Sequence, residues 1–179
     1  MKIYITGAQC TGKSTLCKLL GEKLLNHQVV SPARAVYTGY TGDSLTELEM
    51  SFKIGRAMKE IFTSANIISD RFFTDVYAYS SIYGADRLSL YELGWLAKEA
   101  SKREDSLVCY VPIEFEFKPD GVRYLFHREE VDKLIVNVLN EYNVRYVTVT
   151  GELDLRVNKV LSYIEKGFPL KGGGVYKNE

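Results

Sequence analysis

The most informative stretch of the chain is a glycine-rich octet near its start. It matches the pattern G-x-x-x-x-G-K-[ST] in full and consists of Gly7, Ala8, Gln9, Cys10, Thr11, Gly12, Lys13 and Ser14. Glycines let such a loop curl until successive N–H groups point at phosphate oxygens. Lys13 can then reach the β- and γ-phosphates, and the Ser14 hydroxyl can ligate Mg²⁺. The octet, together with Thr15, therefore predicts a Walker A loop that binds ATP.

The elements expected on either side support this interpretation. Residues 2–6 are short, apolar and partly β-branched, as in a buried strand, and leucines recur at helical spacing over residues 14–25. A loop between a strand and a helix is the setting in which this pattern binds phosphate. We therefore prefer phosphate binding to a glycine turn that merely joins the two elements. Cys10 could be a redox-sensitive thiol, but we favour the simpler view that its position tolerates many residues.

The loop predicts a nucleoside triphosphate but does not name the reaction. A GTPase would carry D-x-x-G and N-K-x-D elements, yet no Asp is followed three residues later by Gly, and Asn158-Lys159 lacks the Asp. A motor or remodelling ATPase would need an apolar strand that ends in adjacent acids. The strand expected to end at Val111 is followed only by Glu114. The sequence therefore excludes the first class and disfavours the second.

A second group of reactive side chains follows the strand expected at residues 66–69. Asp70 can accept a proton from an attacking hydroxyl group or hold Mg²⁺ through water. Arg71 offers a planar set of donors to a substrate or to the phosphoryl group in transfer. The alternative is that Asp70 caps a helix and that Arg71 is incidental. Next to a phosphate-binding loop we favour the catalytic interpretation.

These motifs resemble a known family. The loop, the stretch Asp70-Arg71-x-x-x-Asp75-x-x-x-Tyr79 and the later Asp120-Gly121-Val122-Arg123 resemble small P-loop kinases related to the nicotinamide riboside kinase domains of bacterial NAD-salvage proteins. More distantly they are similar to thymidylate and deoxynucleoside kinases. The resemblance covers about residues 1–165. It implies transfer of the ATP γ-phosphate to a nucleoside-like hydroxyl or to a nucleotide phosphate.

The resemblance also suggests residues for the acceptor and for the base of ATP. Relatives often carry an acid three residues before an arginine after the second strand; here Arg34 matches, but Ser31 replaces the acid. Arg34, Asp75 and Tyr79 are therefore candidate acceptor residues. Arg156 follows the fifth expected strand, where relatives hold adenine, and could stack on the base. An exposed helix residue is the alternative for Arg156.

A lid is expected over about residues 112–128. Phosphoryl transfer needs positive charge as negative charge spreads over the transferring group, and Lys118, Arg123 and Arg128 cluster in this region. Lids in related kinases cover the phosphates and exclude water. Among these residues, Arg123 is the first candidate for a catalytic role and Arg128 is the second. The alternative is a solvated loop with ordinary surface charge.

Alternating strand and helix patterns predict how these residues are positioned. We expect an α/β protein with the P-loop NTPase architecture, a three-layer α/β/α arrangement around a five-stranded parallel sheet. Trp95 is expected in the core, and Ser44 with Glu47 in a capping box. The kinase domain spans residues 1–166, and a glycine-rich stretch predicts a flexible tail at 167–179. The expected strands cover 2–6, 28–30, 66–69, 106–111 and 145–150, and the helices 14–25, 43–65, 73–82, 89–102, 129–142 and 153–165.

Composition narrows the function further. Twenty-three Lys and Arg balance twenty-three Asp and Glu among 179 residues, so a general cationic field for nucleic acid is absent. Three cysteines without C-x-x-C spacing disfavour a disulfide scaffold or a zinc site. No apolar run is long enough for a membrane span, and the early loop leaves no room for a signal peptide. We expect a cytoplasmic, single-domain protein that could form a homodimer.

The combined prediction is an ATP- and Mg²⁺-dependent kinase that acts on a small nucleoside or nucleotide. Two alternatives stay open. One is a kinase of a nucleic-acid hydroxyl, either a 5′-OH or a hydroxymethylated base, which the neutral charge disfavours. The other is an ATP-binding regulatory module that has no acceptor.

Overall fold

The computed structural model describes residues 1–38, 46–116 and 127–166, which contain five strands and seven helices. Their order along the chain is β1 (Lys2–Thr6), α1 (Lys13–Lys23), β2 (Gln28–Val30), α2 (Pro32–Thr38), α3 (Glu47–Ile61), β3 (Ile67–Asp70), α4 (Phe73–Ile82), α5 (Arg87–Lys102), β4 (Ser106–Tyr110), α6 (Arg128–Glu141), β5 (Val147–Thr148) and α7 (Leu153–Lys166).

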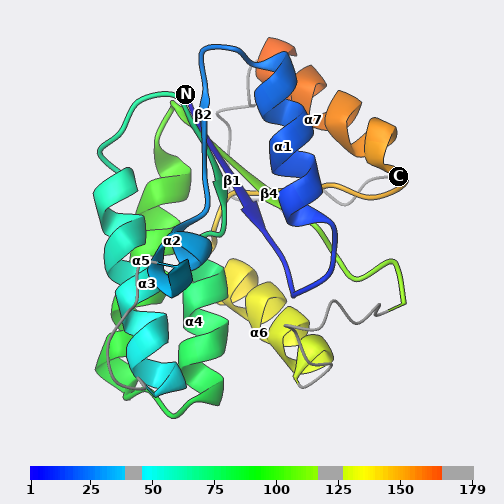
Figure 1. The fold of residues 1–179 in the computed structure, drawn as a ribbon. Coiled ribbons are helices and arrows are strands. Elements are labelled where there is room, and N and C mark those ends of the chain that lie inside the picture. Colours follow the sequence, from blue (N-terminus) through cyan, green and yellow to red (C-terminus); the bar gives the residue numbers. More distant parts are fainter. Residues whose placement is uncertain (39–45, 117–126, 167–179) are drawn as a thin grey trace.

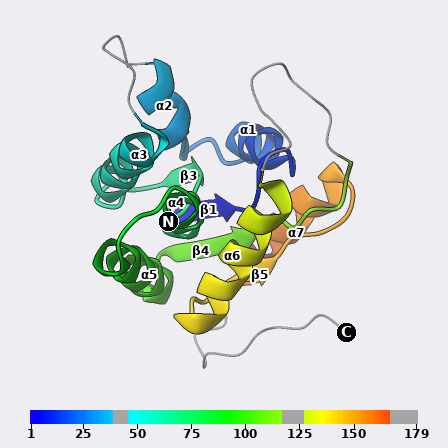
Figure 2. The same cartoon turned by 90° about the horizontal axis from the view of Figure 1, so that it is seen from below.

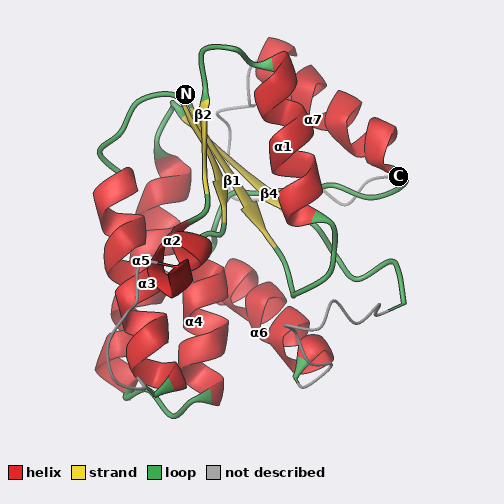
Figure 3. Cartoon of the chain, viewed as in Figure 1, coloured by secondary structure: helices red, strands yellow, loops and turns green. Residues whose placement is uncertain are grey.

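The strands form one parallel sheet in the order β2-β3-β1-β4-β5. Helices α1 and α7 cover one face, whereas α3, α4, α5 and α6 lie on the other side (Figures 1 and 2). Figure 3 shows the strands enclosed between these two groups of helices. The expected three-layer α/β/α fold with five parallel strands is therefore confirmed.

The central strand β1 shows why the sheet lies between two helical layers. All five of its residues are buried, as expected for a parallel strand covered on both faces. Side chains alternate between the faces of a strand, so Ile3 and Ile5 pack with Leu16 and Val160 on the α1–α7 side. Tyr4 points to the opposite core and packs against Phe72.

Three local predictions need correction. Residues 32–38 form a helix that was not expected, because Pro32 starts α2 instead of only ending a strand; proline is well tolerated in the first turn of a helix. Helix α3 begins at Glu47, not at Asp43, and its capping box pairs Thr46 with Glu49, whereas Ser44 of the predicted box lies outside the described residues. Trp95 is not in the core: its side chain is 49% exposed on α5.

The parallel arrangement brings the chemically important loops together. Strand β1 pairs directly with β3 on one side and with β4 on the other. Their carboxyl ends therefore lie at one edge of the sheet, where ligands bind in folds of this kind. None of the described helices combines the length and apolar character needed to cross a membrane.

Candidate functional site

The loop between β1 and α1 requires glycine at both ends of its curl. Gly7 has φ 150°, and a β-carbon there would lie 2.3 Å from the carbonyl oxygen of Val111. Gly12 has φ 90° and caps the N-terminus of α1, a conformation that side chains disfavour. The loop therefore curls against the residue that follows β4. The N-terminus of α1, with its partial positive charge, lies at the other end of the loop, where it can attract an anion bound by the loop.

Lys13 and Ser14 begin α1 at the base of this loop. The Lys13 side chain is buried, and its Nζ donates a hydrogen bond to the carbonyl oxygen of Ala8. The Ser14 hydroxyl donates to Oδ2 of Asp70 at 2.5 Å. Asp70 stands at the end of β3, the neighbour of β1, and is 8% exposed. The two residues predicted to hold Mg²⁺ are thus in direct contact.

The alternative that Asp70 caps a helix does not fit the structure. Helix α4 begins at Phe73, and the carboxylate that caps it belongs to Asp75, whose Oδ2 accepts the backbone N–H of Phe72 at 2.9 Å. Asp75 is fully buried, and its Oδ1 accepts Nη1 of Arg71 at 3.2 Å. Asp75 therefore holds the start of α4 and the Arg71 guanidinium together.

Arg71 has an uncommon backbone conformation, with φ 153°. The Ser69 hydroxyl donates to its carbonyl oxygen at 2.9 Å and helps to fix the turn. Burial opposes the charge of the guanidinium, but Tyr79, Asp75 and Asp70 favour it more strongly, so the pKa of Arg71 is raised. Unusual backbone of this kind gathers at functional sites, here directly after Asp70.

Tyr79 connects this second motif to the loop. Its hydroxyl donates to Oε1 of Gln9 at 2.9 Å, and the Arg71 guanidinium lies 5.1 Å above its ring. The ring also stacks on Tyr83, with centroids 6.5 Å apart. Tyr79 thus lies beside the loop and Asp75 in the first turn of α4, whereas Arg34 is exposed on α2. The roles of all three in acceptor binding stay predictions.

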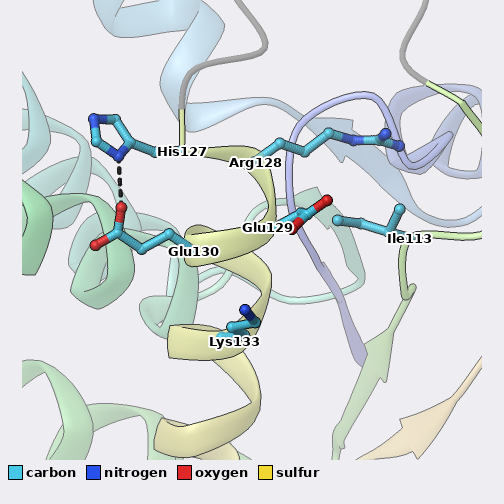
Figure 4. Close-up of a pocket in the computed structure, with 6 residues that line it drawn as sticks. All are labelled: Ile113, His127, Arg128, Glu129, Glu130 and Lys133. Carbon is cyan, nitrogen blue, oxygen red and sulfur yellow. Dashed lines mark hydrogen bonds and ion pairs between the residues drawn. The ribbon is translucent and has the colours of Figure 1, made fainter.

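Arg128 reaches the loop from the first turn of α6 (Figure 4). Its Nε donates to the carbonyl oxygen of Gln9 at 3.0 Å, and its Nη2 donates to that of Cys10 at 3.2 Å and to that of Phe115 at 2.9 Å. The residue is 6% exposed. Arg123, the other predicted lid arginine, lies outside the described residues, as does most of the expected lid.

Arg156 reaches the loop from α7. It is 1% exposed, which excludes the alternative of an exposed helix residue. Its Nη1 donates to the carbonyl oxygen of Thr11 at 2.6 Å and its Nε to that of Gly151 at 2.7 Å, while Nη2 donates to Oε2 of Glu114 at 2.6 Å. The predicted contact of Arg156 with adenine stays a prediction.

Two acids lie near the loop in roles that the sequence did not predict. Oδ2 of Asp132 accepts the Tyr110 hydroxyl at 2.9 Å. Burial raises the pKa of Asp132, although the Tyr110 hydroxyl, the Ala8 amide, Lys13 and Arg128 all act to lower it. Asp132 follows Arg128 by four residues in a predicted helix, and this spacing could have placed both on one face.

The other acid, Glu114, accepts the backbone N–H of Gly151 in addition to Arg156. The Glu114 carboxylate therefore links Arg156 to the backbone at Gly151.

Two hollows open next to these residues. One, of about 560 Å³, is lined by Cys10, Gly12, Glu114, Phe115 and Glu116 at the edge of the loop. The other, of about 490 Å³, lies along the start of α6 (Figure 4) and is lined by Ile113, His127, Arg128, Glu129, Glu130 and Lys133. In it the His127 side chain interacts with Glu130. The first hollow therefore borders the loop itself, and the second lies beside Arg128, which contacts the loop.

Comparison with known proteins agrees with this arrangement. Residues 2–156 match a family model described as an AAA domain. No curated protein matches the chain. Since the family model covers more than half of the chain, the protein belongs to this family.

Solved structures with a similar fold include nucleoside and nucleotide kinases. Thymidylate kinase from Candida albicans is 16% identical, with a TM-score of 0.62 and coverage of 92% of this chain and 91% of its own. Deoxyadenosine kinase from M. mycoides is 14% identical, with a TM-score of 0.62 and coverage of 93% and 99%. A NadR protein in complex with NR is 18% identical, with a TM-score of 0.65; the match covers 95% of this chain and 52% of NadR. The chain has the fold of P-loop nucleoside and nucleotide kinases, and the expected resemblance is confirmed.

Proposed function

We propose that the protein is an ATP- and Mg²⁺-dependent phosphotransferase whose acceptor is a small nucleoside or nucleotide. The observation that carries this proposal is the 2.5 Å contact between Ser14, at the start of α1, and Asp70, at the end of β3. This contact supports the proposal because Asp70 has the chemistry of a metal ligand or base and lies next to the loop that would bind the phosphates. The kinase fold of the similar structures supports the same reaction class.

The loop would bind the triphosphate through its amides and through Lys13. Because the loop and the N-terminus of α1 present N–H groups to one place, they stabilise the negative charge of the β- and γ-phosphates. Lys13 adds a full positive charge once its Nζ exchanges the Ala8 carbonyl for a phosphate oxygen. These groups orient the γ-phosphate and neutralise the charge that spreads over it during transfer.

Ser14 and Asp70 fit a Mg²⁺ ion by their chemistry. A hydroxyl and a carboxylate are hard oxygen ligands, and Mg²⁺ in phosphate sites uses few protein ligands together with waters and phosphate oxygens. Within the described part of the chain, no cluster of three or more His, Cys, Asp or Glu side chains is placed to hold a metal. When bound, the ion would withdraw negative charge from the phosphates.

Asp70 and Arg71 would act on the acceptor. Asp70 would orient an attacking hydroxyl and accept its proton. Arg71, held by Asp75, presents a fixed guanidinium beside the loop, where it would stabilise charge on the transferred group. The stacked rings of Tyr79 and Tyr83 offer an aromatic surface of the kind on which bases stack.

A transfer assay tests this proposed function, with labelled ATP as donor and with nucleosides, nucleoside monophosphates and hydroxyl-bearing oligonucleotides as acceptors. Lys13→Ala should abolish transfer and weaken ATP binding sharply, because the positive charge that would face the phosphates is lost. Asp70→Asn should lower turnover and leave ATP affinity nearly intact. Full activity of Asp70→Asn would disprove the role given to this carboxylate.

The same assay separates the two alternatives. Label on oligonucleotides, with acceptor binding that weakens steeply as salt rises, would indicate a nucleic-acid kinase. ATP binding without label on any acceptor would favour the regulatory module. Neither alternative is favoured by a specific contact in the described residues.

A further inference from the structure

Three successive carbonyl groups at the tip of the loop bind arginines from outside. The carbonyl oxygens of Gln9 and Cys10 accept Arg128, and that of Thr11 accepts Arg156. Arg128 comes from α6 and Arg156 from α7, two helices that the sheet separates. The outer side of the loop is therefore fixed from both sides of the sheet.

This outward fixing determines the direction of the loop amides. A trans peptide is planar, so its N–H points away from its C=O. When the carbonyls of residues 9, 10 and 11 point outward to arginines, the N–H groups of Cys10, Thr11 and Gly12 point to the opposite, inner side. The positive φ values of Cys10 (57°) and Gly12 (90°) fit the alternating backbone of an anion-binding nest.

The two arginines are also linked to each other. Nη2 of Arg128 donates to the carbonyl oxygen of Phe115, while the Arg156 guanidinium lies 5.0 Å over the Phe115 ring and donates to Glu114. Glu114 and Phe115 thus form a bridge behind the loop. Hydrogen bonds from charged donors are stronger than neutral ones, so the two arginines hold the outward orientation of these carbonyls firmly.

We propose that Arg128 and Arg156 are positioning residues that hold the loop in its phosphate-binding shape before a nucleotide arrives. This inference rests on the proposed function, because it takes the loop as the phosphate site. It assigns Arg128 a different role from the catalytic one that the sequence predicts. The guanidinium acts through the backbone of the loop and not on the transferring phosphoryl group.

The test compares binding with turnover in single variants. ADP and ATP affinities are measured by calorimetry, and kcat is measured at saturating ATP with the acceptor found in the panel above. Arg128→Ala and Arg156→Ala should each weaken ADP and ATP binding about tenfold or more, equally for both nucleotides, while kcat changes less than about threefold. Adding guanidinium ion to Arg128→Ala should restore part of the ADP affinity, which a purely structural defect would not allow.

Lysine variants and a matched control keep the test decisive if an alanine variant does not fold. Arg128→Lys keeps the charge, but its ammonium is a point donor that cannot reproduce the fork over two carbonyls, so an intermediate loss is expected. Arg145 donates to the carbonyl oxygen of Arg103 at 2.8 Å, away from the loop. Arg145→Ala should therefore leave nucleotide affinity unchanged.

Other results would overturn the inference. Unchanged ADP affinity in folded Arg128 and Arg156 variants would refute the positioning role. Unchanged ADP affinity with a hundredfold fall in kcat for Arg128→Ala would show that Arg128 is catalytic instead. If the wild-type protein binds neither ADP nor ATP, the proposed function fails together with this inference, whereas wild-type binding with unaffected variants defeats the inference alone.

Discussion

Replacement of Arg156 by methionine should destabilise the protein strongly. The side chain is 2% exposed and forms an ion pair with Glu114, which is 28% exposed, and it also donates to two backbone carbonyls. Breaking a buried pair by removal of one partner costs about 3–5 kcal/mol. Since Glu114 keeps some contact with water, we expect about 3–4 kcal/mol. For a chain of this size, that corresponds to a fall in Tm of about 6–16 °C.

Thermal and urea unfolding followed by circular dichroism measure this loss. Arg103→Met is the matched control, because the Arg103 pair with Asp105 is exposed and such pairs contribute about 0–1 kcal/mol. In the Arg156→Met background, Glu114→Gln should recover more than about 1 kcal/mol by removing the stranded charge. A loss below about 1 kcal/mol in Arg156→Met would refute the reasoning, since the guanidinium would then not be holding the site together.

Three further perturbations test separate features. Gly7→Ala should abolish nucleotide binding, measured by calorimetry, because its β-carbon would meet a carbonyl oxygen at 2.3 Å; binding near the wild-type level would contradict the geometry of the loop. Hydrogen bonds from Arg103 and then Lys2 lower the pKa of Asp105 from 3.8 to about 2, so its contribution to stability is present above pH 3.8 and is lost as the pH falls to about 2. Asp105→Asn should therefore flatten the fall in urea-unfolding free energy over this range, and an unchanged pH profile would count against the pairing. Trp95 is the only tryptophan and is 49% exposed, so acrylamide should quench its fluorescence readily. Weak quenching would show that Trp95 is buried and would contradict its exposed position on α5.

The fold was accessible from the sequence because its signals are local. Strand β1 and helix α1 follow directly from an apolar run and a leucine pattern, and the loop pattern fixes what joins them. Helix α2 was missed because Pro32 stops a strand and starts a helix equally well. Trp95 was misplaced because the side chain's apolar character does not say which face of α5 meets the sheet.

The site was only partly accessible for a related reason. Lys13, Ser14 and Asp70 could be predicted because each belongs to a short motif whose residues lie next to one another in the sequence. The loop partners of Arg128 and Arg156 are backbone carbonyls more than a hundred residues away, and no side-chain pattern marks a carbonyl. Because both arginines are far from the loop in sequence, Arg128 was interpreted as a lid residue and Arg156 as a residue that stacks on the base.

In the proposed kinase, the hydrogen bond from Tyr79 to Gln9 would couple the binding of the acceptor to the binding of the nucleotide. Tyr79 belongs to α4, and the carbonyl oxygen of Gln9 accepts Arg128 of α6, so an acceptor that moved the Tyr79 ring would also perturb the loop at Gln9. Any cooperativity that arises through this bond is reciprocal: occupancy of either half changes affinity at the other by the same factor.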